Sequence, residues 1–202
     1  MIKNIVFDFG RVIVDFDESK MTRAFVSDET ILPTVRDVVF DRLYWDKLDL
    51  GTITDDEVKA GIATRLPSEL VAAAHAVYDH WIDHIDMIPH IEDALRAAKA
   101  RAEGVYLLSN ISIKFTREYP ATPHIKNILS YFDGLVFSGP LHMVKPDAAI
   151  FRHLLDTYGL RAEETLFIDD SEKNIAGAAA LGIHTYLFNG DALRLTEYIR
   201  SL

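Results

Sequence analysis

The 202-residue sequence contains no cysteine. Disulfide bonds, thiol nucleophiles and thiolate metal sites are therefore excluded together, and the absence is typical of a cytoplasmic protein, which is the location we expect. Long hydrophobic runs are missing as well, because no run approaches the roughly 20 apolar residues that span a bilayer. Met1 leads directly into a strand pattern, with no basic and apolar leader. We expect neither a membrane span nor a membrane partner.

Positive charge is also scarce. Lysine and arginine total 21 against 31 aspartates and glutamates, which gives a net charge of −10. Because nucleic-acid binding needs a basic face, we expect no nucleic-acid partner. A small anionic substrate remains compatible with this charge if a lysine, a metal ion or a helix N-terminus supplies local positive charge. The sequence leaves the oligomeric state open between monomer and homodimer.

The first part of the chain, from about residue 17 to residue 87, has helical periodicity and no convincing strand. Thr54 and Glu57 form a capping box that opens a helix running to Leu66. Pro67 begins another helix, whose apolar residues recur at helical spacing. We therefore predict an all-helical segment here.

From Pro89 onward, strands and helices alternate. We predict strands over 105–108, 134–138, 165–168 and 183–188, and helices over 91–102, 147–158, 171–181 and 192–199, with Ser171 capping its helix. Together with a first strand that begins at Ile5, this alternation indicates an α/β fold with a doubly wound, parallel, Rossmann-like sheet. The predicted domains are a core of residues 1–16 and 88–202 and an inserted helical domain of residues 17–87.

Polar residues follow four of these elements at the point where each strand ends or the next helix begins. They are Asp8, Ser109 with Asn110, Lys145, and Asp169 with Asp170. A lone aspartate after a strand is usually a turn residue. However, the carboxyl ends of parallel strands meet at one edge of a sheet, where ligands bind. The convergence therefore favours a functional site.

These residue types fit one reaction. An aspartate is ionised at neutral pH, so Asp8 is able to attack phosphorus and form an aspartyl-phosphate. Asp8 and Asp170 offer the hard oxygen ligands that Mg²⁺ prefers. Lys145 adds a compact positive charge and the Ser109 hydroxyl a hydrogen bond to a phosphoryl oxygen. The set predicts metal-assisted phosphoryl transfer.

The chain resembles the haloacid dehalogenase superfamily, whose four motifs it matches in order and spacing. The motifs are Asp8-Phe9-Gly10-Arg11-Val12, Leu108-Ser109-Asn110, Lys145-Pro146, and Ile168-Asp169-Asp170-Ser171 with Asn174 beyond. The helical segment resembles the C1 cap of that superfamily. The first motif is similar to that of a subgroup that includes the α-D-glucose-1-phosphate phosphatases.

The resemblance implies a role for each motif residue. Asp8 is the implied nucleophile and metal ligand, and Asp170 the second carboxylate ligand. Asp169 acts through a metal-bound water, and the backbone carbonyl of Gly10 is a further ligand. Ser109, Asn110 and Lys145 are the implied phosphate-binding residues, and Lys145 is an implied catalytic residue as well. The expected function is hydrolysis of small phosphorylated metabolites, including sugar phosphates, with Mg²⁺.

Gly10 departs from the superfamily pattern, which usually has an aspartate there to protonate the leaving group. Positioned acid-base catalysis is worth about 10²–10⁴ in rate, so its loss slows the enzyme without abolishing catalysis. Arg11 and Asp15 lie close to Asp8 in the sequence, and the sequence does not decide whether either replaces the acid. A metal-independent 2-haloacid dehalogenase and a weakened binding protein of the same fold remain alternatives.

Two further features have competing interpretations. His80 and His84 are four residues apart on a predicted helix and are able to share a metal, although a surface or core pair is the commoner arrangement. Tyr44 and Trp45 suit either a substrate contact or the core of the helical segment.

Overall fold

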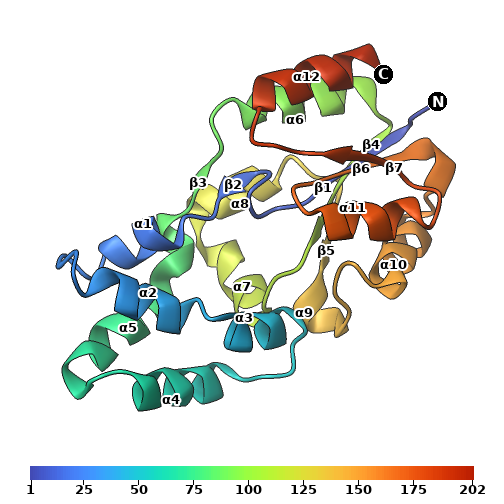
Figure 1. Ribbon diagram of the computed structural model, residues 1–202. Coiled ribbons are helices and arrows are strands. Elements are labelled where there is room, and N and C mark those ends of the chain that lie inside the picture. Colours follow the sequence, from blue (N-terminus) through green and yellow to red (C-terminus); the bar gives the residue numbers. More distant parts are fainter.

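Five parallel strands form the centre of the computed structural model, which describes residues 1–202 (Figure 1). In the order of the sheet they are β5 (Gly134–Phe137), β4 (Gly104–Ser109), β1 (Asn4–Phe7), β6 (Thr165–Asp169) and β7 (His184–Leu187). All neighbouring pairs are parallel. Counted along the chain the order is 3-2-1-4-5, so the direction of winding reverses at β1. The predicted doubly wound sheet is confirmed.

Helices cover both faces of this sheet. Helices α6 (Ile91–Arg101) and α12 (Ala192–Ser201) lie on one face, and α10 (Ala148–Tyr158) and α11 (Glu172–Ala179) on the other (Figure 1). The alternation of side chains along β1 explains the division. Ile5 and Phe7 belong to an apolar cluster with residues of α6 and α12, whereas Val6 packs in a second cluster with residues of α10 and α11.

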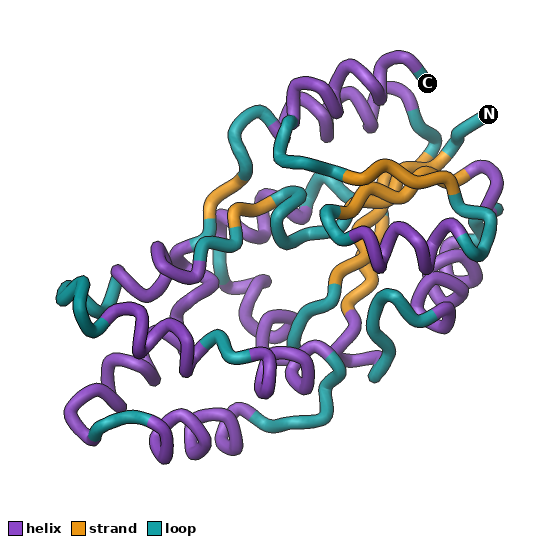
Figure 2. The backbone as a smooth tube through the Cα atoms, viewed as in Figure 1, coloured by secondary structure: helices purple, strands orange, loops and turns teal.

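A helical segment lies beyond one end of the sheet (Figure 2). It contains α1 (Glu18–Arg23), α2 (Leu32–Val39), α3 (Arg42–Asp49), α4 (Asp55–Arg65), α5 (Ser68–His80) and the 3₁₀ turn η1 (Trp81–His84). The capping box of Thr54 and Glu57 at the start of α4 is confirmed. The larger apolar cluster continues from the strands into these helices, so the segment packs against the sheet domain.

A short antiparallel ribbon joins the two parts, where no strand was predicted. Strand β2 (Val14–Asp15) leads into the helical segment and pairs with β3 (Asp86–Met87), which leads out of it. The prediction of a purely helical segment up to residue 87 was therefore wrong at its end. Two residues per strand are too few to produce a period-2 pattern.

Several short elements between β4 and β6 were not predicted either. They are α7 (Ile113–Glu118), η2 (Tyr119–Ala121), α8 (Pro123–Leu129), α9 (Ser138–Leu141) and η3 (Ala162–Glu164). Ser138, predicted to end a strand, instead begins α9, and its side chain is fully buried.

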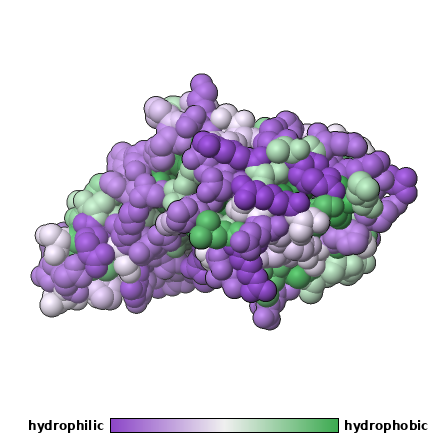
Figure 3. Space-filling model, turned by 90° about the horizontal axis from the view of Figure 1, so that it is seen from above, coloured by the Kyte–Doolittle hydropathy of each residue, from purple (hydrophilic) through white to green (hydrophobic).

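The surface is mainly polar on the face seen in Figure 3, where apolar residues form only small, separate patches. The large exposed hydrophobic residues are scattered along the sequence: Met1, Leu43, Ile113, Leu187 and Leu193. None of the helices combines the length and the apolar character required to cross a bilayer.

Candidate active site

Three carboxylates meet where β1 and β6 end. Asp8 follows the fully buried strand β1, Asp169 is the last residue of β6, and Asp170 comes next. The two strands are hydrogen-bonded neighbours, and the Asp8 amide donates to the carbonyl of Ile168 over 2.9 Å. One ligand oxygen from each carboxylate lies within 4.8 Å of the others. The structure therefore brings these predicted residues together at the point where the sheet reverses its winding.

Lys145 lies between two of the carboxylates. Its Nζ donates to Asp8 Oδ1 at 2.6 Å, to Asp169 Oδ2 at 2.7 Å and to the carbonyl oxygen of Leu108 at 3.0 Å. Only 1% of the lysine side chain is exposed. All three ammonium hydrogens thus have acceptors, and the buried cation compensates part of the negative charge around it.

Asp169 is held by further donors. Its carboxylate accepts the backbone N–H of Ser171 at 2.8 Å and the side-chain amide of Asn174 at 3.1 Å. Ser171 occupies the N-cap position of α11 as predicted, but its side chain makes no capping hydrogen bond. The backbone of Ser171 is used to orient Asp169 instead.

The two polar residues after β4 have different surroundings. Ser109 lines a cavity above the carboxylates and is almost fully buried. The side-chain amide of Asn110 makes two hydrogen bonds with the backbone of Lys145, donating to its carbonyl at 3.0 Å and accepting its N–H at 2.8 Å. The Asn110 side chain therefore fixes the segment that carries Lys145.

Burial and mutual repulsion disfavour charge on the carboxylates. Burial raises the pKa of Asp8 to about 7, with Lys145 opposing the shift and Asp169 adding to it. Burial and the neighbouring Asp169 also raise the pKa of Asp170. Burial would lower the pKa of Lys145, but its ion pairs with Asp8 and Asp169 outweigh this, and the net shift is upward. Three acids thus lie close together with one lysine among them, and a bound cation would stabilise their negative charge.

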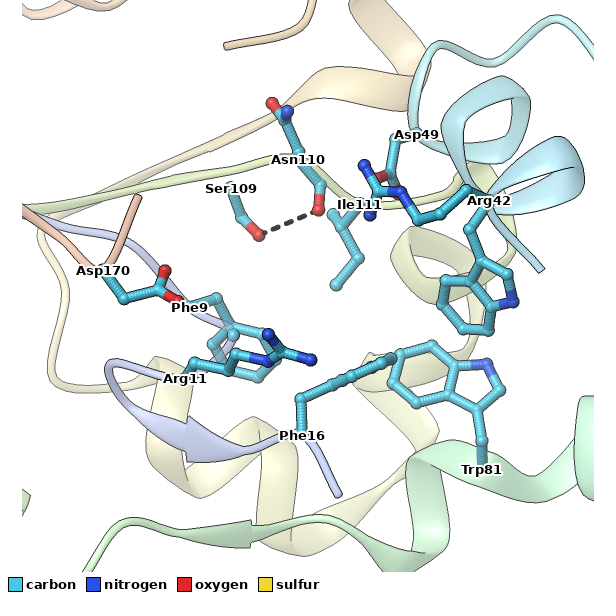
Figure 4. A pocket seen from close by; sticks show the side chains of 12 residues that line it. Phe9, Arg11, Phe16, Arg42, Asp49, Trp81, Ser109, Asn110, Ile111 and Asp170 are labelled. Carbon is cyan, nitrogen blue, oxygen red and sulfur yellow. Dashed lines mark hydrogen bonds between the residues drawn. The ribbon is translucent and has the colours of Figure 1, made fainter. Parts of the chain in front are cut away.

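A cavity of about 230 Å³ opens between these residues and the helical segment (Figure 4). Part of its lining comes from the segments that follow the strands and includes Gly10, Ser109 and Asp170. Its apolar wall consists of Phe16, Trp45 and Trp81, whose ring centroids are 5.4 to 5.6 Å apart. The lining is completed by Phe9, Arg11, Arg42, Asp49, Asn110 and Ile111.

The sequence did not identify the contribution of α3 to this cavity. Arg42 and Asp49, at the two ends of the helix, lie on the opposite side of the cavity from Asp170 and Arg11 (Figure 4). Burial raises the pKa of Asp49 to about 7, with Arg42 opposing the shift. The sequence did contain one indication that Asp49 is unusual. It lies two residues before Gly51, in the last turn of a helix, where the negative end of the helix dipole disfavours an acidic side chain.

The structure also places the residues that had competing interpretations. Trp45 lines the cavity, whereas Tyr44 lies against Gly61 and beneath Arg65. His80 and His84 both pack on the ring of Phe25, which favours the interpretation of the pair as packing residues over that of a metal site.

The two proposed substitutes for the missing acid are placed differently from each other. Arg11 is exposed but lines the cavity. Asp15 is exposed on β2 and opens onto a different hollow of the surface, away from Asp8.

Comparison with known proteins agrees with this geometry. The chain is 29% identical over 191 residues to a D-ribitol-5-phosphate phosphatase from Bacteroides thetaiotaomicron, covering 92% of this chain and 91% of that protein. A crystal structure of a HAD family enzyme from the same organism, in complex with magnesium and inorganic phosphate, superposes with a TM-score of 0.70. The identity is 25%, over 95% of this chain and 96% of that one.

A more distant structure shares the fold alone. The L-2-haloacid dehalogenase from Xanthobacter autotrophicus is 17% identical, with a TM-score of 0.65 over 92% of this chain and 76% of that one.

The profile of the haloacid dehalogenase-like hydrolases matches residues 2–182. The chain therefore belongs to this family of hydrolases, as its four motifs predicted.

Proposed function

We propose that the protein is a magnesium-dependent phosphatase of small phosphorylated metabolites, working through an aspartyl-phosphate at Asp8. The observation that carries the proposal is the placement of the Asp8 carboxylate, bonded to Lys145 and grouped with Asp169 and Asp170 beside a cavity. The similarity to a ribitol-phosphate phosphatase and to an enzyme crystallised with magnesium and phosphate supports it.

The carboxylate cluster fits a magnesium ion by its chemistry. Three acids with ligand oxygens within 4.8 Å of one another have a single lysine to balance them. Oxygen ligands from a few carboxylates, completed by water and phosphate, are what Mg²⁺ prefers. We assign Asp8, Asp170 and the Gly10 carbonyl as direct ligands and Asp169 as a ligand through water. The ion would supply positive charge against the phosphoryl oxygens.

The residues of the chain then have distinct tasks. Asp8 attacks phosphorus with one carboxylate oxygen. Lys145 and the hydroxyl of Ser109 stabilise the negative charge on the phosphoryl oxygens, because both are in place before substrate arrives. Ser109 ends β4, and Lys145 is bonded to the carbonyl oxygen of Leu108 in the same strand. Asn110 keeps Lys145 in place through its two backbone hydrogen bonds.

The helical segment of residues 17–87 acts in this proposal as a cap domain on the core of residues 1–16 and 88–202. It supplies Trp45 and Trp81, which form an aromatic wall with Phe16 at the edge of the core, and the organic part of a substrate would lie against this wall. A cavity of about 230 Å³ has room for a small phosphate ester rather than a macromolecule. Sugar and polyol phosphates are the substrates to test first.

The test is phosphate release from D-ribitol 5-phosphate, sugar phosphates and an aryl phosphate. We expect activity with Mg²⁺, at least a hundredfold loss in excess chelator, and recovery when Mg²⁺ is restored. Asp8→Asn should abolish activity, whereas the matched variant Asp15→Asn should retain it, because Asp15 is exposed outside the cavity. Full activity in chelator contradicts the metal mechanism, and an active Asp8→Asn variant contradicts the nucleophile.

The alternatives predict other outcomes in the same assay. Halide release from 2-haloacids in chelator would establish the dehalogenase. Inactivity toward every phosphate ester and every haloacid would favour the binding protein.

A further inference from the structure

The proposed reaction leaves one requirement unmet. When the bond from phosphorus to the ester oxygen breaks, an alkyl leaving group departs as a strongly basic alkoxide unless it receives a proton. Gly10, near the nucleophile, has no side chain to supply one. A proton donor must therefore come from elsewhere around the cavity.

Few residues around the site are able to fill this role. The cavity adjoins a second hollow that shares Gly10, Arg42, Asp49 and Asn110 with it. Neither lining contains histidine, tyrosine or cysteine. The arginines do not release protons at neutral pH. Asp8 and Asp170 are the assigned nucleophile and metal ligand, and Lys145 is held by two carboxylates.

Three titratable side chains remain around the two hollows. Asp46 is exposed and paired with Arg42 at 2.5 Å, and Lys173 is exposed. Asp49 is partly buried and lines both hollows. Of the three, Asp49 alone lines the cavity that holds Ser109 and Asp170.

Asp49 is held in place by contacts with the sheet domain. Its backbone carbonyl accepts a hydrogen bond from the buried Ser138 hydroxyl at 2.6 Å. The next carbonyl, of Leu50, lies 3.1 Å from His142 Nδ1. Gly51 then approaches Gly139 so closely that a Cβ on Gly51 would collide with the Gly139 carbonyl oxygen. Three consecutive residues thus fix the end of α3 against α9, and Asp49 faces the cavity (Figure 4).

The surroundings of Asp49 favour its protonated form. Burial raises its pKa to about 7, and the charges of Asp46 and Asp8 add to the shift. Arg42 on the same helix and Lys145 from the core oppose it. The C-terminal end of α3, which is the negative end of the helix dipole, also disfavours a negative charge at this position. Just after α9, His142 faces the carbonyl of Leu50. Near neutral pH a substantial fraction of Asp49 therefore carries a proton.

We infer that Asp49 is the general acid and base of the reaction, in place of a side chain at position 10. This inference rests on the proposed phosphatase function. In the first step Asp8 forms a bond to phosphorus, the bond to the ester oxygen breaks, and the oxygen takes the proton of Asp49 and leaves as an alcohol. In the second step a water attacks phosphorus and gives its proton to Asp49. The bond to Asp8 breaks, its electron pair returns to the carboxylate, and inorganic phosphate leaves.

The variant Asp49→Asn separates the two steps. With an alkyl phosphate, kcat should fall by about 10²–10⁴-fold, because both steps need the proton transfer. With an aryl phosphate, whose leaving group needs no proton, we expect a rapid burst of about one phenolate per enzyme followed by slow turnover. The phosphorylated protein should accumulate and be visible in the intact mass. The wild-type decline of kcat above about pH 7 should also disappear.

The matched control is Asp56→Asn, which removes an exposed acid of the helical segment that lines neither hollow and should keep wild-type kinetics. Asp49→Glu should recover part of the alkyl-phosphate activity. If Asp49→Asn melts like the wild type and loses alkyl and aryl turnover equally without a burst, or keeps wild-type turnover of alkyl phosphates, the inference is overturned. An inactive wild type, or an active Asp8→Asn, overturns the phosphatase function and the inference with it.

A second variant asks for rescue. Gly10 lines both hollows and a Cβ there would meet no heavy atom within 4 Å, so a side chain can be introduced at this position. The double variant Gly10→Asp with Asp49→Asn should hydrolyse alkyl phosphates at least tenfold faster than Asp49→Asn alone. If the double variant folds but hydrolyses alkyl phosphates no faster than Asp49→Asn, the loss of a proton donor is not the cause of the defect in Asp49→Asn.

Discussion

The edge of the sheet and the helical segment contribute to one cavity in different ways. Lys145 and Asp169 have side chains that are 1% and 0% exposed, and each has several hydrogen-bond partners within the sheet domain. Arg42, on the helical side, has a side chain that is 79% exposed and pairs only with its neighbour Asp46. The sheet domain therefore builds its residues into a fixed network. The helical side depends on docking against the sheet domain for its geometry.

Around the end of α3, a few polar and close backbone contacts add to the apolar packing between the two parts. Ser138 of α9 and His142 just after it contact the carbonyls of Asp49 and Leu50, and Gly51 touches Gly139. An ion pair between Arg117 of α7 and Asp55 of α4, at 2.5 Å, is a further link between the sheet domain and the helical segment. Damage to the network should reduce stability and activity together, whereas damage to the docking contacts should reduce activity with little effect on the sheet domain.

The largest effect should come from the network. Lys145→Met leaves Asp8 and Asp169 buried without their cation, and removing one partner of a buried ion pair costs about 3–5 kcal/mol. We expect a decrease of that size in the free energy of unfolding, measured by urea denaturation in chelator at pH 7.5, together with loss of phosphatase activity. Lys173→Met, which removes an exposed lysine from the neighbouring hollow, should change stability by less than about 0.5 kcal/mol. If Lys145→Met and Lys173→Met are equally stable, the hydrogen-bonded network around Lys145 does not stabilise the sheet domain as proposed.

The docking contact offers an intermediate effect. Gly51 has φ of +70°, so Gly51→Ala should cost about 1–2 kcal/mol through backbone strain alone. Gly159→Ala is a matched control, since its φ is +64° but a Cβ there meets nothing within 4 Å. Gly51→Ala should lose at least as much stability as Gly159→Ala, because the collision adds to the strain, and only Gly51→Ala should lower kcat/KM, by about tenfold, as Asp49 shifts away from the cavity. A similar kcat/KM for both would mean that the docking does not position Asp49.

The smallest effect concerns the pH dependence of stability. The pKa of Asp49 is raised from 3.8 to about 7, so the native state holds its proton more tightly than the unfolded state does. This contribution to stability is complete below about pH 4 and is lost as the pH rises through about 7. Asp49→Asn should therefore be more stable than the wild type at pH 8, by the order of 1 kcal/mol after allowance for partial exposure. Urea denaturation of both proteins at pH 5 and pH 8 tests this. A stability advantage of Asp49→Asn that is larger at pH 5 than at pH 8 would contradict the prediction.

The sequence predicted the sheet domain well because its signals are local. Buried parallel strands are short apolar runs, and the polar residues after them, such as Asp8, Ser109 and Asp169, are recognisable from their positions alone. The exchange of hydrogen bonds between Asn110 and the Lys145 backbone could not be predicted, because it joins residues 35 positions apart.

The helical side of the site was missed for the same reason. Arg42 and Asp49 are ordinary charged residues of an amphipathic helix, and such residues usually face water. Their position over the cavity depends on Ser138 and Gly139, about 90 residues further along the chain. The β2–β3 ribbon was missed because a pairing of two residues with two others has no periodic signal.

The ribbon has a consequence for how such a molecule can be altered. Val14 pairs with Met87 and Asp15 with Asp86, so the chain leaves the sheet domain and returns to it at adjacent points, about 5 Å apart. Residues between them can therefore be exchanged for another segment of any length whose ends lie equally close, without rerouting a single strand of the sheet. The replacement would have to cover the apolar surface that the present helices cover, and it would bring its own residues to face Asp8.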